Sequence, residues 1–232
     1  MSNAFPGPVL CIVSHPDDEI LGCGASISYF NSLSYDTRVL FINEGVSSRF
    51  ENKNDSLISD EIISRENMAK EVAKFLDFKI LDFLRYENLR MQNIDMLSLV
   101  KKIMGYLKDF KPDIIFTHHP GDLNSDHGTT YNASFTACRP NPGFMIKNFY
   151  TFEIPSSTDW ASSHSEIFLP NMYIDISNFL EKKIEALKFY DKEIRSFPHS
   201  RSIESIKALS IIRGGAFGCM YAEAFSTIKS SI

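Results

Sequence analysis

The amino-acid sequence predicts an α/β fold, and two observations support this class. Short apolar runs alternate with segments whose apolar residues recur at helical spacing, which is the pattern of a mostly parallel sheet covered by helices. The 232 residues include 44% hydrophobic residues, enough for a sizeable core without disulfide support. We therefore expect a Rossmann-like three-layer sandwich. We also expect one domain over residues 1–232, because no linker, repeat or low-complexity tract divides the chain.

The first half of the chain carries the clearest strand signals. Each predicted strand is a short apolar run that ends at polar or turn-forming residues, as buried strands of a parallel sheet do. The predicted strands are Val9–Val13, Arg38–Ile42, Lys79–Leu84 and Asp113–Thr117, followed later in the chain by Asn148–Ile154 and Met172–Ile176.

The segments between these strands place apolar residues on one helical face. The predicted helices are Glu19–Asn31, Ser56–Leu76, Met96–Leu107, Asp126–Cys138 and Phe179–Ile194. Residues 139–170 contain several prolines and few periodic signals. We therefore expect that part of the chain to pass over the sheet edge or over the functional site.

Composition and charge exclude several classes of function. The net charge of −5 argues against a nucleic-acid-binding protein, which usually carries a basic patch. No apolar run approaches the about 18 residues of a membrane span, and residues 1–8 lack the features of a secretory signal. The four cysteines form no CxxC pair, which argues against a cysteine-only zinc site. We expect a cytoplasmic protein in a reducing compartment.

The first chemical motif, residues 14–19 (SHPDDE), directly follows the first predicted strand. Ligands of open α/β sheets bind beyond the carboxyl ends of the strands. The motif places His15, Asp17, Asp18 and Glu19 there, and an imidazole with carboxylates is a donor set for a metal such as zinc. A helix N-terminus is the plainer interpretation, since acidic residues favour the helix dipole and aspartate can cap it. It explains one or two acids, but not His15 or the doubled aspartate.

The second motif, residues 118–127 (HHPGDLNSDH), follows the fourth predicted strand. His118, His119 and His127 lie in it, so with His15 four of the six histidines occupy two post-strand loops. Taken alone, His118 or His119 reads as a surface loop residue. Both loops lie at the same edge of a parallel sheet, however, and a catalytic zinc typically takes three protein ligands. The sequence therefore predicts a metal site where the two loops meet.

These two motifs together resemble the PIG-L/LmbE-like family of zinc-dependent N-deacetylases. The family has His-Pro-Asp-Asp-Glu after its first strand, here His15 to Glu19, and Asp-His after a later strand, here Asp126-His127. The helix that contains Arg65 and the segment 213–225 are weaker matches, and the resemblance covers most of the chain. It implies a zinc-dependent hydrolase that removes an N-acetyl or other N-acyl group from an N-acetylglucosamine-type sugar or glycoconjugate.

Carried over residue by residue, the resemblance implies that His15, Asp18 and His127 hold the metal. It makes Asp17 the general base that activates the water. Asp126 would orient or adjust a neighbouring histidine. Arg65 and His119 are the expected contacts to the substrate, a small N-acetylated sugar or glycoconjugate, and assembly into a homo-oligomer stays open.

One position departs from the family pattern. Many members have His-Pro-Asp-His in the second motif, whereas residues 124–127 here read NSDH. The Asn124 amide can donate a hydrogen bond to an oxyanion but cannot shuttle a proton. We therefore expect Asn124 to stabilise the oxyanion, with a helix N-cap as the plainer alternative. Whether Asp17 alone, His118 or His119 delivers the proton stays open.

Two other functions compete with this one. A metal-dependent phosphoesterase would need further carboxylates for a second metal, for which Glu44, Asp122 and Glu153 are candidates without a defining spacing. A non-catalytic sugar-binding member of the same fold is disfavoured because Asp17 is intact.

A dinucleotide-binding loop is disfavoured as well. Gly22 and Gly24 match the first two glycines of GxGxxG, but Ile27 stands where the third belongs. We expect these glycines to permit close packing of the first helix on the sheet.

Overall fold

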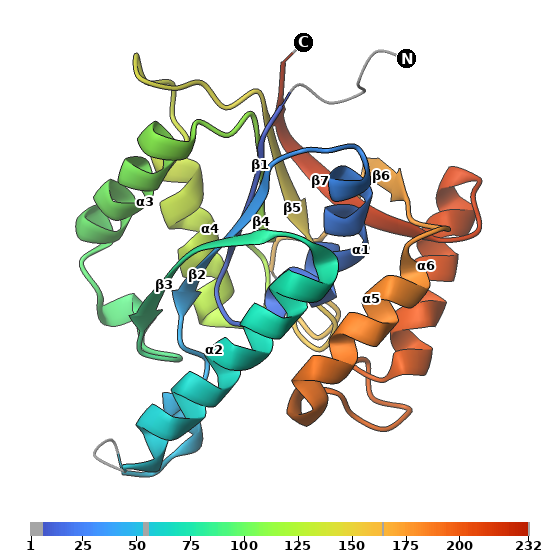
Figure 1. Ribbon diagram of the computed structural model, residues 1–232, viewed down its shortest axis with the longest axis horizontal. Helices are drawn as coiled ribbons and strands as arrows, with labels where there is room; N and C mark the ends of the chain where they lie inside the picture. The colour runs from blue at the N-terminus through green and yellow to red at the C-terminus, as the bar shows by residue number, and fades with distance from the viewer. Residues whose placement is uncertain (1–6, 53–55, 164, 232) are drawn as a thin grey trace.

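A computed structural model describes residues 7–52, 56–163 and 165–231 (Figure 1). It contains a seven-stranded, mostly parallel sheet with helices on both faces, which confirms the predicted α/β sandwich. Residues 1–6, most of the segment that lacks secretory features, lie outside the described ranges. None of the helices in those ranges combines the length and the apolar character that crossing a bilayer requires. The cytoplasmic location stays a prediction.

The sheet has the order β3-β2-β1-β4-β5-β7-β6. The first five strands in the chain pair in parallel, and β7 runs antiparallel to both β5 and β6. The strands are β1 Val9–Val13, β2 Thr37–Asn43, β3 Lys79–Tyr86, β4 Ile114–His118, β5 Asn148–Phe152, β6 Met172–Asp175 and β7 Ala222–Ser230.

Two helices cover one face of the sheet and four cover the other (Figure 1). The first pair is α3 Met96–Phe110 and α4 Ser125–Ala137. The opposite face carries α1 Asp18–Ser32, α2 Leu57–Leu76, α5 Leu180–Leu187 and α6 Ile203–Phe217. Short 3₁₀ turns complete the structure at η1 Ser47–Arg49, η2 Met91–Asn93 and η3 Lys188–Glu193.

The packing of the central strand β1 explains why its own sequence is a continuous apolar run. Val9, Cys11 and Val13 belong to the core beneath α1 and α2. Leu10 and Ile12 belong to the core beneath α3 and α4. Both faces of a parallel sheet are buried, so no polar alternation marks such a strand.

The first helix is broken in its middle, and a buried ion pair holds the break. Cys23 has φ −148° and ψ 23°, outside the helical region. Lys183 donates to the carbonyl of Leu21 (2.8 Å) before the break, while Glu223 accepts from the N–H of Ser26 (2.7 Å) after it. Lys183 and Glu223 also pair with each other at 2.6 Å. The C-terminal elements α5 and β7 thus fix the helix that begins at the predicted site.

Gly22 allows this helix to lie close to the sheet. A Cβ atom at Gly22 would collide with the ring of Phe152 on β5, which confirms the expected close packing. At Gly24 a Cβ would instead meet Ile20 of the same helix.

The C-terminal part departs most from the predictions. The predicted helix Phe179–Ile194 was wrong in its second half: α5 ends at Leu187 and passes into η3, where Tyr190 leaves the helical region. Tyr190 is fully buried, with its hydroxyl bonded to Glu19 (2.7 Å), so tertiary contacts override the helical pattern. Helix α6 and strand β7 had no predicted counterpart.

Candidate metal centre

The site lies where the order of the strands reverses. Strand β1 has β2 on one side and β4 on the other, so the loops after β1 and β4 diverge from neighbouring strand ends. Such a switch point is the usual ligand-binding place of an open α/β sheet. Residues 14–19 and 118–127 meet there, as the sequence predicted.

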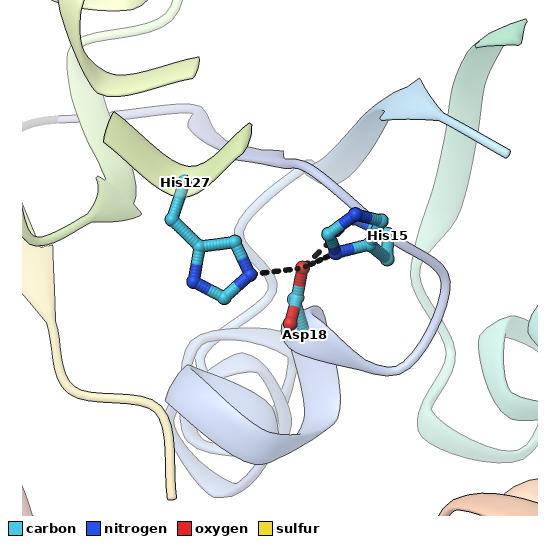
Figure 2. Close-up of side chains that lie close together, drawn as sticks. All are labelled: His15, Asp18 and His127. Carbon is cyan, nitrogen blue, oxygen red and sulfur yellow. Dashed lines mark hydrogen bonds and ion pairs between the residues drawn. The ribbon is translucent and has the colours of Figure 1, made fainter. Parts of the chain in front are cut away.

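His15, Asp18 and His127 converge at this point (Figure 2). His15 Nδ1 lies 3.1 Å and His127 Nε2 lies 3.4 Å from Asp18 Oδ2. One donor atom from each residue falls within 4.8 Å of the others, and all three residues are buried. The structure thus brings the three predicted metal ligands into one cluster.

The donor atoms of this cluster fit a metal ion. Among the described residues, His127 Nε2 and Asp18 Oδ1 are buried and have no hydrogen-bond partner. The far nitrogens of both histidines face carboxylates: His127 Nδ1 lies 2.7 Å from Asp122, and His15 Nε2 lies 3.2 Å from Asp126. A histidine ligand usually donates its other N–H to such a carboxylate, which fixes the tautomer with the lone pair toward the metal.

The electrostatics of the cluster favour positive charge at its centre. Burial would lower the pKa of His127, but Asp18 and Asp122 raise it to about 10. Burial would raise the pKa of Asp18, yet the imidazoles of His127, His118 and His15 hold it well below its usual range. A divalent cation supplies such positive charge to nitrogen and carboxylate donors.

Asp17 stands next to the cluster in a strained backbone conformation. Its φ of 130° is rarely adopted by a residue with a side chain, and such conformations cluster at active sites. Although Asp17 precedes α1, its side chain caps no helical N–H. The carboxylate instead pairs with Arg65 and Arg201. Burial raises the pKa of Asp17 and the two arginines oppose the rise. The plainer interpretation, a capping aspartate, therefore does not describe Asp17.

Asp126 and Asn124 both lie at the start of α4. Asp126 Oδ2 contacts His15 and accepts from the Asn43 amide (3.0 Å) and the Leu89 N–H (2.7 Å). Asp126 therefore contacts a histidine, as predicted, but one from the other loop. Asn124 Oδ1 accepts from the N–H of Asp126 at 2.9 Å, which is an N-cap. The plainer alternative for Asn124 thus describes its geometry, and the oxyanion role stays a prediction.

Arg65 and His119, the two predicted substrate contacts, are engaged with the protein itself. Arg65 is buried, donates to the Pro16 carbonyl (2.9 Å) and pairs with Glu193 (2.7 Å) as well as with Asp17. His119 Nε2 lies 2.8 Å from the Glu166 carbonyl. His119 thus contacts the loop that follows β5, while Arg65 faces the site. Their contact with substrate stays a prediction.

His118 packs beneath the cluster. Its ring stacks on His127 with 3.9 Å between centroids, and its Nε2 accepts from the N–H of Ser14 (2.8 Å). Burial lowers the pKa of His118 well below its usual value, and the nearby His127 adds to the effect. A neutral, buried imidazole with one nitrogen bound to the backbone is a poor proton donor.

Sequence reasoning missed the residues that reach the site from the C-terminal part. Arg201 and Glu193 contact Asp17 and Arg65, and Tyr190 contacts Glu19. Burial raises the pKa of Glu19 to about 8, against the hydrogen bond from Tyr190. No motif marks these residues, and each of their contacts joins segments more than a hundred positions apart.

A polar pocket adjoins the cluster, and residues from the N-terminal and the C-terminal part of the chain line it. Its lining is rich in amide, guanidinium and carboxylate groups. The lining residues are His15, Asp17, Gly45, Arg49, Arg65, Asn88, Leu89, Asn124, Glu193 and Arg201.

The fold and the cluster define an α/β protein with a His-Asp-His site at the switch point of its sheet. Residues 10–138, more than half of the chain, match the family described as PIG-L: GlcNAc-PI de-N-acetylase. The protein belongs to this deacetylase family. Over 185 residues it is 28% identical to YaiS of Escherichia coli K12, an uncharacterized deacetylase, and the match covers 78% of this chain and 88% of YaiS.

Two solved structures share the fold. The N,N'-diacetylchitobiose deacetylase from Pyrococcus horikoshii superposes with a TM-score of 0.72 at 20% identity, covering 95% of this chain and 83% of that one. GalB, the 4-carboxy-2-hydroxymuconate hydratase from Pseudomonas putida KT2440, gives 0.78 at 16% identity and 98% coverage of both chains. At these identities the likeness concerns the fold alone.

Proposed function

We propose that this protein is a zinc-dependent hydrolase that removes an N-acetyl or other N-acyl group from an N-acetylglucosamine-type sugar or glycoconjugate. Membership of the deacetylase family supports the reaction class. The single observation that carries the proposal is the cluster of His15, Asp18 and His127 with the carboxylate of Asp17 beside it. Metal ligands and a separate base are the two components of metal-assisted amide hydrolysis.

The proposal gives each residue a chemical task. His15, Asp18 and His127 would hold the ion, which when bound polarises the amide carbonyl and lowers the pKa of water. Asp17 takes the proton of the attacking water and returns it to the leaving amine nitrogen. His118 accepts a backbone hydrogen bond and His119 faces a backbone carbonyl, which supports Asp17 alone as the proton carrier.

The arrangement of carboxylates disfavours a two-metal phosphoesterase. Glu44 accepts from the N–H groups of its own loop, including that of Ser47 (3.0 Å). Asp122 pairs with His127, and Glu153 forms a two-pronged ion pair with Arg213. Glu44 and Glu153 are thus committed elsewhere. Asp122 alone remains, in a second group with His118 and His127 that could hold a metal ion but shares His127 with the first group.

A substrate screen tests the proposal. The purified protein is stripped with a chelator, reloaded with zinc, and assayed for free amine release from N-acetyl and N-formyl glucosamine derivatives, including a phosphate and an aryl glycoside. We expect zinc-dependent amine release that is lost in His127→Ala together with bound metal. A parallel arm offers a phosphate ester and, because GalB shares the fold, an unsaturated dicarboxylic acid. Turnover in that arm without amine release would overturn the proposal.

A further inference from the structure

Arg201 connects the predicted base to the C-terminal part of the protein. Its Nη1 donates to Asp17 Oδ2 at 3.1 Å. Its Nε donates to the hydroxyl of Ser156 (2.8 Å) and lies 3.2 Å from the carbonyl of Pro155. The side chain is 19% exposed. One edge of the guanidinium is therefore fixed by the loop after β5, while the other edge meets the carboxylate.

Arg65 reaches the same carboxylate oxygen from the opposite part of the chain. Its Nη2 lies 3.1 Å from Asp17 Oδ2, the distance at which Arg201 lies as well. Asp17 Oδ1 has no hydrogen bond to any residue in the described ranges. Two cations on one oxygen oppose rotation of the carboxylate and leave the other oxygen available.

We infer that Arg201 is a positioning residue of the active site. Together with Arg65 it holds Asp17 Oδ2, so that Oδ1 is the oxygen that accepts the proton from water. The inference rests on the proposed function, in which Asp17 is the base. During hydrolysis the water oxygen forms a bond to the acyl carbon as Asp17 Oδ1 takes the proton of the water. The proton then passes to the nitrogen as the C–N bond breaks.

The chemistry of arginine suits this task. A guanidinium presents several donors in a rigid plane, so one side chain can bind the loop and the carboxylate at once. A lysine ammonium could meet Asp17 but has no second, fixed donor for Ser156. We therefore expect the effect of a substitution to depend on geometry as well as on charge.

Kinetics of Arg201→Met and Arg201→Lys test the inference. A misplaced catalytic group typically costs about 10²-fold, so we expect kcat of the methionine variant to fall by about 10²-fold with KM little changed. The lysine variant should recover part of the rate, and added guanidinium ion should raise the rate of the methionine variant only. Arg195→Gln is the matched control, because Arg195 is exposed in the same segment and contacts the Lys192 carbonyl. It should keep the wild-type kcat.

Crystal structures of the wild type and Arg201→Met provide a measurement that does not depend on turnover. We expect the Asp17 carboxylate to change its orientation in the variant while the metal content of the protein stays the same. An unchanged carboxylate orientation, or a methionine variant with wild-type kcat, would overturn the inference. If the methionine variant does not fold, the lysine variant is analysed in the same way. A wild-type protein that releases no amine would overturn the proposed function, while the crystal structures would still decide the role of Arg201.

Discussion

The two parts of the chain contribute to the site in different ways. The part up to α4 supplies the metal cluster and Asp17 from two short motifs, within which Asp18 contacts His15 and Asp122 contacts His127. The part from β5 onward supplies none of the three clustered ligands. It supplies Arg201, which contacts Asp17 across 184 positions in the sequence.

The part up to α4 therefore supplies the reactive groups, and the part from β5 onward orients them. The first part holds the reactive groups on loops after two adjacent parallel strands, as open α/β sheets commonly do. The second part fixes those groups from outside: Arg201 contacts Asp17, and Lys183 with Glu223 fixes the broken helix α1. If this division is right, substitutions in the first part should abolish chemistry with little loss of stability, and substitutions in the second should lower stability or rate.

The largest effect is expected for Asp17→Asn. The amide keeps the shape of the side chain and removes its basicity, so turnover should fall by about 10²–10⁴-fold. The substitution also leaves the three clustered ligands unchanged, so fold and metal content should persist. Steady-state kinetics with elemental analysis measure both. Asp109→Asn on the exposed side of α3 serves as control. Near-wild-type turnover of Asp17→Asn would remove Asp17 as the base.

The second largest effect is a loss of stability, caused by a substitution in the part from β5 onward. Lys183→Met leaves the Glu223 carboxylate buried without its cation, which typically costs about 3–5 kcal/mol in unfolding free energy. The double variant with Glu223→Gln should recover part of that loss. Chemical denaturation measures the difference, with Lys207→Met as control, because its pair with Glu181 is exposed and worth about 1 kcal/mol at most. A single variant as stable as the control would show that the buried pair does not fix α1.

The part up to α4 could be predicted from the sequence better than the part from β5 onward. Strands β1, β2 and β4 could be located because a strand buried on both faces reads as an apolar run, as Val9–Val13 does. The ligand loops could be located because their residues cluster after such runs. Local signals of this kind need no knowledge of the tertiary structure.

The C-terminal elements lack such signals. Helix α6 buries only Ile206, Ser210 and Gly214, while Ile211 and Ile212 are exposed, so its apolar residues do not mark its packed face. Strand β7 carries a buried Glu223 whose partner, Lys183, is known only from the fold. These residues satisfy one another over long range, and a single sequence does not reveal such pairs.

A smaller effect is expected at Asp122, which orients His127 within the first part. Replacing a carboxylate that contacts a histidine ligand typically costs about 10–100-fold in metal affinity. Asp122→Asn should therefore weaken zinc binding by that factor in a competition titration with a chromophoric chelator. Asp113→Asn is the control, since Asp113 precedes β4 at the opposite end of the strand and pairs with Lys147. Equal affinities in the two variants would exclude the orienting role of Asp122.

The smallest effect is expected at Asn124 if it only caps the helix, and two substitutions separate this role from that of an oxyanion donor. Asn124→Ala removes the N-cap of α4 and should cost about 1 kcal/mol of stability. Asn124→Ser keeps a capping oxygen but removes the amide N–H₂ group, which takes no part in the cap because the bond uses Oδ1. If Asn124 only caps the helix, the serine variant should match the wild type in both stability and turnover. If the amide also donates to the oxyanion, both variants should lose about 10²–10³-fold in turnover, the usual effect of losing one such donor. Thermal unfolding and kcat of the two variants decide between these roles: wild-type kcat in both would exclude the oxyanion role and leave Asn124 as a structural residue of the first part.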